Sequence, residues 1–136
     1  MAPITRVDLR LVTANVSGAG TDSDVYLGIG GREFFVDSAV NDFEQGSDRT
    51  YTFGTGPNVL NAGDNDPRTP VQIDTNDLDR FPRYIRMEPE GTNPDWLLEE
   101  VSVTVNPGQA SQRTFTKLGG SARAKLGEKA GKVLYL

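Results

Sequence analysis

The chain has 136 residues, of which 36% are hydrophobic and 24% charged, and this length suits one domain with a single modest core. It contains neither histidine nor cysteine, which excludes imidazole bases, thiol nucleophiles, disulfide bonds and zinc sites of the usual kind. The formal net charge is -5, and the side chains left for site chemistry are carboxylates, amides and hydroxyls, whose oxygen atoms suit hard cations, above all calcium.

Alternation of apolar and polar residues predicts β-strands along most of the chain. The first strand, 7–12, places Val7, Leu9 and Leu11 on one face. The same pattern predicts further strands, in chain order, at 24–30, 33–36, 49–53, 71–74, 84–88, 101–105, 113–118 and 133–136. A period of two residues is typical of strands with one buried and one solvated face.

Turn-forming residues separate these strands at short intervals, in stretches such as SGAG, GTGPN, NAGDNDPR, EGTNPD and NPG. No stretch keeps a helical period over three turns. Many short strands joined by turns predict an all-β antiparallel sandwich, and they favour this over a barrel.

The net charge divides unevenly along the sequence. Residues 1–106 carry eight arginines and 18 acidic residues, a balance of -10. Residues 107–136 carry six basic residues and one acidic residue, a balance of +5. Either basic terminal strands neutralise acidic neighbours, or the segment forms a cationic patch for an anionic surface or for head-to-tail contact between copies.

Acidic residues cluster in several loops, but none of these loops is an EF-hand. The third ligand position falls on Tyr26, Arg68 or Leu78 when it is counted from Asp22, Asp64 or Asp74 respectively. None of these side chains can serve as a calcium ligand there. A calcium site would therefore have to combine side chains from separate loops.

Three stretches, in the order GAGTDSDVYLGIGG, FVDSAVNDFEQGSDRTYTFG and PDWLLEEVSVTV, resemble the PLAT (LH2) domain family over about residues 5–106. The resemblance is greatest to the C-terminal membrane-binding domain of the clostridial phospholipase C toxins. It implies an eight-stranded, antiparallel PLAT/C2-like β-sandwich over 1–106. The basic extension 107–136 would then add one or two strands to the same domain.

In that toxin domain, calcium ions lie between loops and bridge to phospholipid head groups. The resemblance implies metal ligands in three loops: Gly20, Asp22 and Asp24 in the first, Asp37, Ser38, Val40 and Asp42 in the second, and Glu90, near Glu88, in the third. Two departures, Gly18 in place of an acid and Pro89 in place of the common asparagine, imply a partial ligand set. A missing carboxylate lowers the expected affinity toward the millimolar range of extracellular calcium modules.

Simpler interpretations exist for most of these residues. Asp22 and Asp24 could bond backbone amides of their own turn, and residues 41–48 could form a turn with Phe43 packed beneath it. The loop acids Asp64, Asp66 and Asp95 are expected to be solvated. Trp96 is expected in the core rather than as a lipid anchor, and the candidates for exposed apolar contact are Phe34, Phe35 and Phe81.

The leading functional hypothesis is a non-catalytic module in which calcium mediates contact with lipid head groups or a protein partner. The alternative is a protein-docking or self-assembling module that uses the charge division without a metal. Paired carboxylates could catalyse glycoside hydrolysis, but no pair stands apart from the loop acids, so no enzyme is predicted. Nucleic acid is not an expected partner, because only the tail is basic. The opening MAPITRVDLR lacks the features of a secretory signal, so the default expectation is a cytoplasmic protein, with signal-free export as the alternative.

Overall fold

The computed structural model describes residues 1–120 and 122–136. The elements are, in chain order, β1 (Arg6–Thr13), β2 (Asp24–Ile29), β3 (Arg32–Phe35), β4 (Asp48–Gly54), α1 (Asp77–Arg80), β5 (Tyr84–Glu88), β6 (Trp96–Val105), β7 (Arg113–Leu118), β8 (Ala124–Leu126) and β9 (Val133–Tyr135). Within the described residues, no helix is both long and apolar enough to span a membrane.

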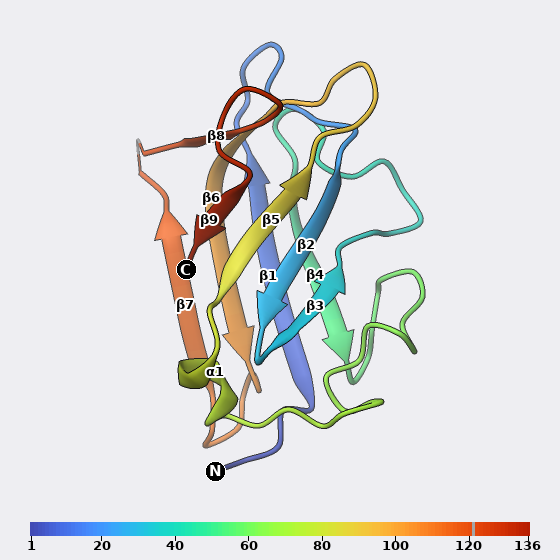
Figure 1. Ribbon diagram of the computed structural model, residues 1–136, viewed down its shortest axis with the longest axis vertical. Coiled ribbons are helices and arrows are strands. Elements are labelled where there is room, and N and C mark those ends of the chain that lie inside the picture. Colours follow the sequence, from blue (N-terminus) through green and yellow to red (C-terminus); the bar gives the residue numbers. More distant parts are fainter. Residues whose placement is uncertain (121) are drawn as a thin grey trace.

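The strands form two antiparallel sheets packed face to face (Figure 1). One sheet has the order β4-β1-β6-β7, with the short β8 paired to the start of β6, and the other has the order β3-β2-β5-β9. The prediction of an all-β antiparallel sandwich is therefore confirmed. Among the described residues the first sheet has five strands, counting β8, and the second has four.

The core lies between the sheets and consists of the apolar residues that the alternation placed on one face. In the first sheet, Leu9 of β1 lies opposite Val103 of β6, and both are fully buried. In the second sheet, Leu27 of β2 lies opposite Ile85 of β5, and both are again fully buried. Burial of this kind stabilises the fold by about 1.5–3 kcal/mol per large aliphatic side chain.

The basic segment 107–136 is part of the sandwich. Its strands β7 and β8 pair with β6 in the first sheet and β9 pairs with β5 in the second, while six strands come from 1–106. Three of its cations pair with acids of the body: Arg113 with Asp79 at 2.9 Å, Arg123 with Glu99 at 2.8 Å, and Lys125 with Asp95 at 3.8 Å. These contacts support the interpretation that the basic strands neutralise acidic neighbours, although each exposed pair contributes little stability.

The strand predicted at 71–74 does not form, so this part of the secondary-structure prediction is wrong. Of this segment only Ile73 is buried, and Asp74 makes one isolated bridge, to Pro3. The Asp74 carboxylate instead accepts the backbone N–H of Asn76 at 2.8 Å, which starts the turn into α1. Local side-chain bonding of this type favours turns over strands.

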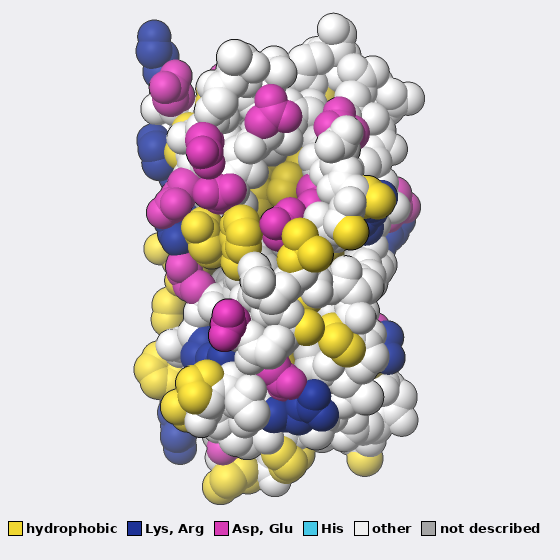
Figure 2. Space-filling view, turned by 90° about the vertical axis from the view of Figure 1, so that its right-hand side faces the viewer, with side chains coloured by type: hydrophobic (Ala, Val, Ile, Leu, Met, Phe, Trp, Pro, Cys, Tyr) yellow, Lys and Arg dark blue, Asp and Glu magenta, His cyan; other side chains and the backbone are white. Residues whose placement is uncertain are grey.

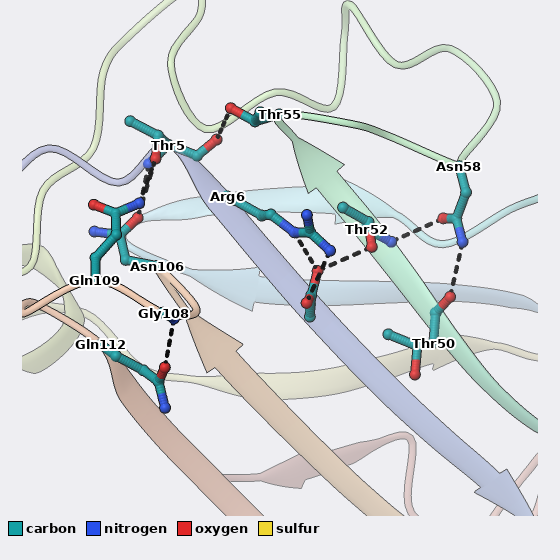
Figure 3. A network of polar contacts seen from close by, with 11 residues as sticks. Thr5, Arg6, Thr50, Thr52, Thr55, Asn58, Asn106, Gly108, Gln109 and Gln112 are labelled. Atoms are coloured by element: carbon teal, nitrogen blue, oxygen red, sulfur yellow. Dashed lines mark hydrogen bonds and ion pairs between the residues drawn. The ribbon is translucent and has the colours of Figure 1, made fainter.

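At the lower end of the sandwich, Asn106 links the end of β6 to the start of β1 (Figure 3). It is fully buried and has a φ of 50°. Its Oδ1 accepts the N–H of Thr5 at 2.9 Å, and its Nδ2 donates to the Pro3 carbonyl and to Ser111 Oγ, each at 3.0 Å. The left-handed backbone conformation suits asparagine better than most residues.

Candidate cation-binding pocket

The candidate site is a cavity of about 220 Å³ at the upper end of the sandwich. It lies where the start of β2 meets the end of β3 and the connection from β3 to β4, at the upper right in Figure 1. Four carboxylates line it: Asp22, Asp24, Asp37 and Asp42. In Figure 2, which shows the molecule from this side, acidic side chains gather around a hollow in the upper half.

The stretch TDSD, residues 21–24, supplies the first two carboxylates by strict alternation. The two hydroxyl residues of this stretch, Thr21 and Ser23, are buried and hold the loop that precedes β6. Thr21 Oγ1 donates to the carbonyl of Asn93 at 2.9 Å, and Ser23 Oγ donates to the carbonyl of Pro94 at 2.8 Å. These hydroxyl bonds fix the backbone of 21–24. The carboxylates of Asp22 and Asp24 are left to line the cavity.

Negative charge is crowded around Asp24. Partial burial raises the pKa of Asp24, and the nearby Glu90 carboxylate raises it further. Glu90 is held close by its own N–H, which donates to Ser23 Oγ at 2.9 Å. Glu88, opposite Asp24 in the β2–β5 register, adds a smaller effect although it is paired with Arg86 at 2.8 Å.

Asp37 lies in a similar environment on the other connection. Burial is the main cause that raises the pKa of Asp37, followed by its hydrogen bond with Asp42 and the negative charge of that group. The charge of Asp24 adds to the same shift. Because Asp24 and Asp37 come from separate segments and line the same cavity, this electrostatic coupling places unfavourable negative charge on both sides of it.

Asp42 differs from the other three acids because both of its oxygen atoms accept hydrogen bonds, from a backbone N–H and two hydroxyls. Its side chain is 8% exposed. Its Oδ2 accepts the N–H of Ser38 at 2.9 Å, and its Oδ1 accepts the hydroxyls of Ser38 at 2.6 Å and Tyr51 at 2.9 Å. Arg49 adds an ion pair at 3.3 Å. Asp42 therefore positions the 38–42 loop.

The structure places the remaining predicted ligands differently. Val40 lines the cavity and is 56% exposed. Gly20, Ser38 and Glu90 are not part of the cavity lining. Gly20 passes so close to the next loop that a Cβ there would lie 2.8 Å from Gln45 N, so glycine is required for packing. The N–H and the hydroxyl of Ser38 both donate to Asp42.

Beneath the cavity, the aromatic side chains belong to the core. Trp96 is fully buried, and its Nε1 donates to Thr13 Oγ1 at 2.8 Å, which confirms the prediction that it packs inside. Phe43 packs on Trp96 with ring centroids 5.2 Å apart. This is the arrangement expected if residues 41–48 form a turn with Phe43 packed beneath it. Phe34 is fully buried, because it is on the inner face of β3, so the prediction of exposed contact is wrong for it. Phe81 is 44% exposed.

The donor chemistry of the cavity fits a hard cation, but the geometry is not preorganised. Among residues 1–120 and 122–136, no three acidic side chains stand close enough together to hold a metal ion as they are placed. The crowded carboxylates would gain from a positive charge between them, and calcium tolerates irregular oxygen coordination. Side-chain movements of Asp22, Asp24 and Asp37 would therefore be needed for binding.

Solved structures of three proteins share this architecture. The alpha toxin from Clostridium absonum matches over 99% of this chain with a TM-score of 0.64 and 20% identity. An alpha toxin from an avian strain of Clostridium perfringens matches over 90% with a TM-score of 0.53 and 21% identity. The lipoxygenase variant Delta413-417:GS LOX matches over 96% with a TM-score of 0.58 and 15% identity.

These likenesses define the class of fold, an antiparallel β-sandwich. The sandwich is of the PLAT type, as the sequence resemblance predicted. The chain spans 32% of the first toxin, 31% of the second and 16% of the lipoxygenase. No protein-family model matches the chain, and no curated protein sequence matches it either.

Proposed function

We propose that this domain is a non-catalytic binding module that holds calcium in the acidic pocket and thereby contacts anionic lipid head groups. The observation that carries the proposal is the convergence of carboxylates from two connecting segments on one cavity, at the end of a PLAT-like sandwich. The family resemblance of the three loop stretches supports the same ion and the same class of ligand.

The charge of the domain explains why a cation would be needed. The whole domain carries a formal net charge of -5, and acidic side chains crowd the pocket, so this end repels anionic surfaces when no ion is bound. Asp22, Asp24 and Asp37 are the residues that would hold the ion, and Asp42 keeps the 38–42 loop next to Asp37 in place. Bound calcium would supply positive charge and coordination positions for phosphate oxygens. The exposed Val40 at the cavity gives the same end an apolar contact.

Thermal unfolding tests the metal half of the proposal. With a dissociation constant of about 1 mM, calcium at about 10 mM stabilises the fold by about 1.4 kcal/mol. For a chain of this length, that corresponds to a rise in Tm of roughly 5 °C. Magnesium at the same concentration is the control for ionic strength. An unchanged Tm with both ions would contradict the metal half.

Vesicle co-sedimentation tests the lipid half. The protein should sediment with phosphatidylcholine/phosphatidylserine vesicles in calcium and remain in solution with chelator or with phosphatidylcholine alone. The variant Asp24→Asn/Asp37→Asn should lose both the Tm rise and sedimentation, while Asp64→Asn, an exposed loop acid away from the cavity, should keep both. Calcium stabilisation without sedimentation would overturn the lipid ligand and retain the metal.

A further inference from the structure

Strand β7 forms an open edge of the sandwich. It is the last strand in the order β4-β1-β6-β7 and lies at the left in Figure 1. Its ladder runs to β6, and no backbone partner occurs on its other side among the described residues. An unpaired edge presents a row of N–H and C=O groups that can bond an added strand.

The register identifies which groups face outward. Gly119 N–H donates to the carbonyl of Glu99 at 3.0 Å, at the end of the β6–β7 register. Since narrow and wide pairs alternate in an antiparallel ladder, the odd-numbered residues of β7 bond to β6. The N–H and C=O groups of Thr114 and Thr116 therefore point away from the sheet. Both side chains are exposed.

The edges on the opposite side of the sandwich are closed by asparagine side chains. Asn58 Oδ1 accepts the N–H of Thr52 at 2.8 Å, and its Nδ2 donates to the carbonyl of Thr50 at 2.9 Å, so it occupies the edge of β4 (Figure 3). Asn65 Oδ1 accepts the N–H of Phe35 at 2.7 Å on β3. β7 has no such cap among the described residues.

Charge defines the chemistry of a strand that could pair with β7. Arg113, Phe115 and Lys117 share the face opposite to the threonines, and Phe115 has the guanidinium of Arg83 4.1 Å from its ring centroid. Arg113 is paired with Asp79, whereas no ion pair involves Lys117 in the described part of the chain. An added strand would therefore place acidic side chains opposite two cations and an apolar side chain opposite the ring.

We propose that β7 accepts an extended acidic segment of another protein by β-strand addition. The segment has the pattern acid–x–apolar–x–acid, which reads the same in both directions and so fits parallel and antiparallel pairing. A second copy of the chain fits poorly, because pairing β7 with itself about Phe115 sets Arg113 against Lys117. Hydrogen bonds between the main chains of β7 and the added segment supply the affinity. The charges of Arg113 and Lys117 supply the selectivity for acidic side chains.

Amide hydrogen exchange measured by NMR tests the proposal with the peptide Ser-Glu-Thr-Val-Thr-Glu-Ser, acetylated and amidated. The amides of Thr114 and Thr116 should exchange more slowly when it is added. The amide of Phe115, which is already bonded to β6, should change little. A peptide with lysine for both glutamates should have no effect.

Two variants make the test specific. Lys117→Glu should weaken the acidic peptide by roughly five- to tenfold and admit the lysine peptide. Thr116→Pro removes an outward N–H without touching the β6 ladder and should abolish binding while the melting curve is retained. If Thr116→Pro unfolds the protein, the effect of Lys117→Glu on the two peptides still tests the proposal.

Three results would overturn the proposal. The first is exchange at Thr114 and Thr116 that the acidic peptide does not slow. The second is equal protection by the lysine peptide. The third is a dimer in sedimentation velocity, without peptide, that already protects these amides, because it would assign the edge to a second copy.

Discussion

Replacing Asp42 with alanine should destabilise the fold in the absence of calcium, because this carboxylate is a structural anchor. It accepts bonds from Ser38, Tyr51 and Arg49, and its side chain is 8% exposed. The variant leaves all of these donors without their partner. The cost should fall mainly on the Tyr51 hydroxyl, because Tyr51 is only 1% exposed and water cannot readily replace the carboxylate.

The magnitude follows from these contacts. A buried hydroxyl without a partner costs about 1–3 kcal/mol, and each further bond contributes about 1 kcal/mol before water compensates Ser38 and Arg49. The sum is about 3 kcal/mol. Unfolding entropy is about 2.1 cal/mol/K per residue, or roughly 0.3 kcal/mol/K for this chain, so Tm should fall by about 10 °C.

Thermal and urea unfolding of Asp42→Ala, Tyr51→Phe and the double variant measure this effect. Tyr51→Phe removes the hydroxyl that Asp42→Ala leaves without a partner, so the double variant should lose less stability than the sum of the single variants. Asp64→Ala is the matched control for loss of an exposed loop acid. A Tm change within about 2 °C for Asp42→Ala, with calcium binding lost, would refute the structural role and make Asp42 a ligand.

Three further predictions concern the pocket and the core. Because burial and neighbouring charge raise the pKa of Asp24 and of Asp37, both groups favour the fold when protonated, and this contribution is lost as pH rises through the raised pKa. In calcium-free thermal melts, Asp24→Asn/Asp37→Asn should therefore gain stability relative to wild type between about pH 4 and neutrality, and a constant difference would contradict this. Trp96→Phe should cost about 2 kcal/mol in urea unfolding through the lost bond to Thr13 and the space left behind, and a cost below about 0.5 kcal/mol would show that the bond is unimportant. Asn106→Ala should cost about 3–4 kcal/mol, and Asn106→Gly less, because glycine keeps the left-handed backbone; equal costs would show that the backbone conformation is unimportant.

The fold was predictable because its strands bury one face each. Alternation in 7–12 and 101–105 identified the two central strands of one sheet, and these lie next to each other in the structure. The same reasoning failed at 71–74, where the exposed Val71 shows that alternation without a neighbouring strand is insufficient. Which strands pair with each other is a property of the tertiary structure, and it cannot be read from local alternation in a single sequence.

The acidic residues of the pocket were predictable as a group, but their separate roles were not. Asp37 and Asp42 look equivalent in the sequence, yet Asp42 is bonded to Tyr51, nine residues away, and Asp37 is not. That the Thr21 and Ser23 hydroxyls hold the loop before β6 was not predicted from the sequence. The alternation of hydroxyl and acidic residues in TDSD is a signal that could have indicated it. Their partners lie more than 70 residues away, so only the fold reveals what they hold.

The two proposed surfaces belong to different parts of the sandwich. The pocket is formed by the start of β2 and the end of β3, in the second sheet, whereas β7 is the far edge of the first sheet. They share no residue, and no hydrogen bond joins them within the described chain, so substitutions at the two sites should act additively. Lys117→Glu should leave the calcium-induced rise in Tm unchanged, and Asp24→Asn/Asp37→Asn should leave protection of Thr114 by the acidic peptide unchanged. If calcium altered that protection in the wild type but not in the pocket variant, the two sites would be coupled, and the coupling would have to pass through the packed core between the sheets.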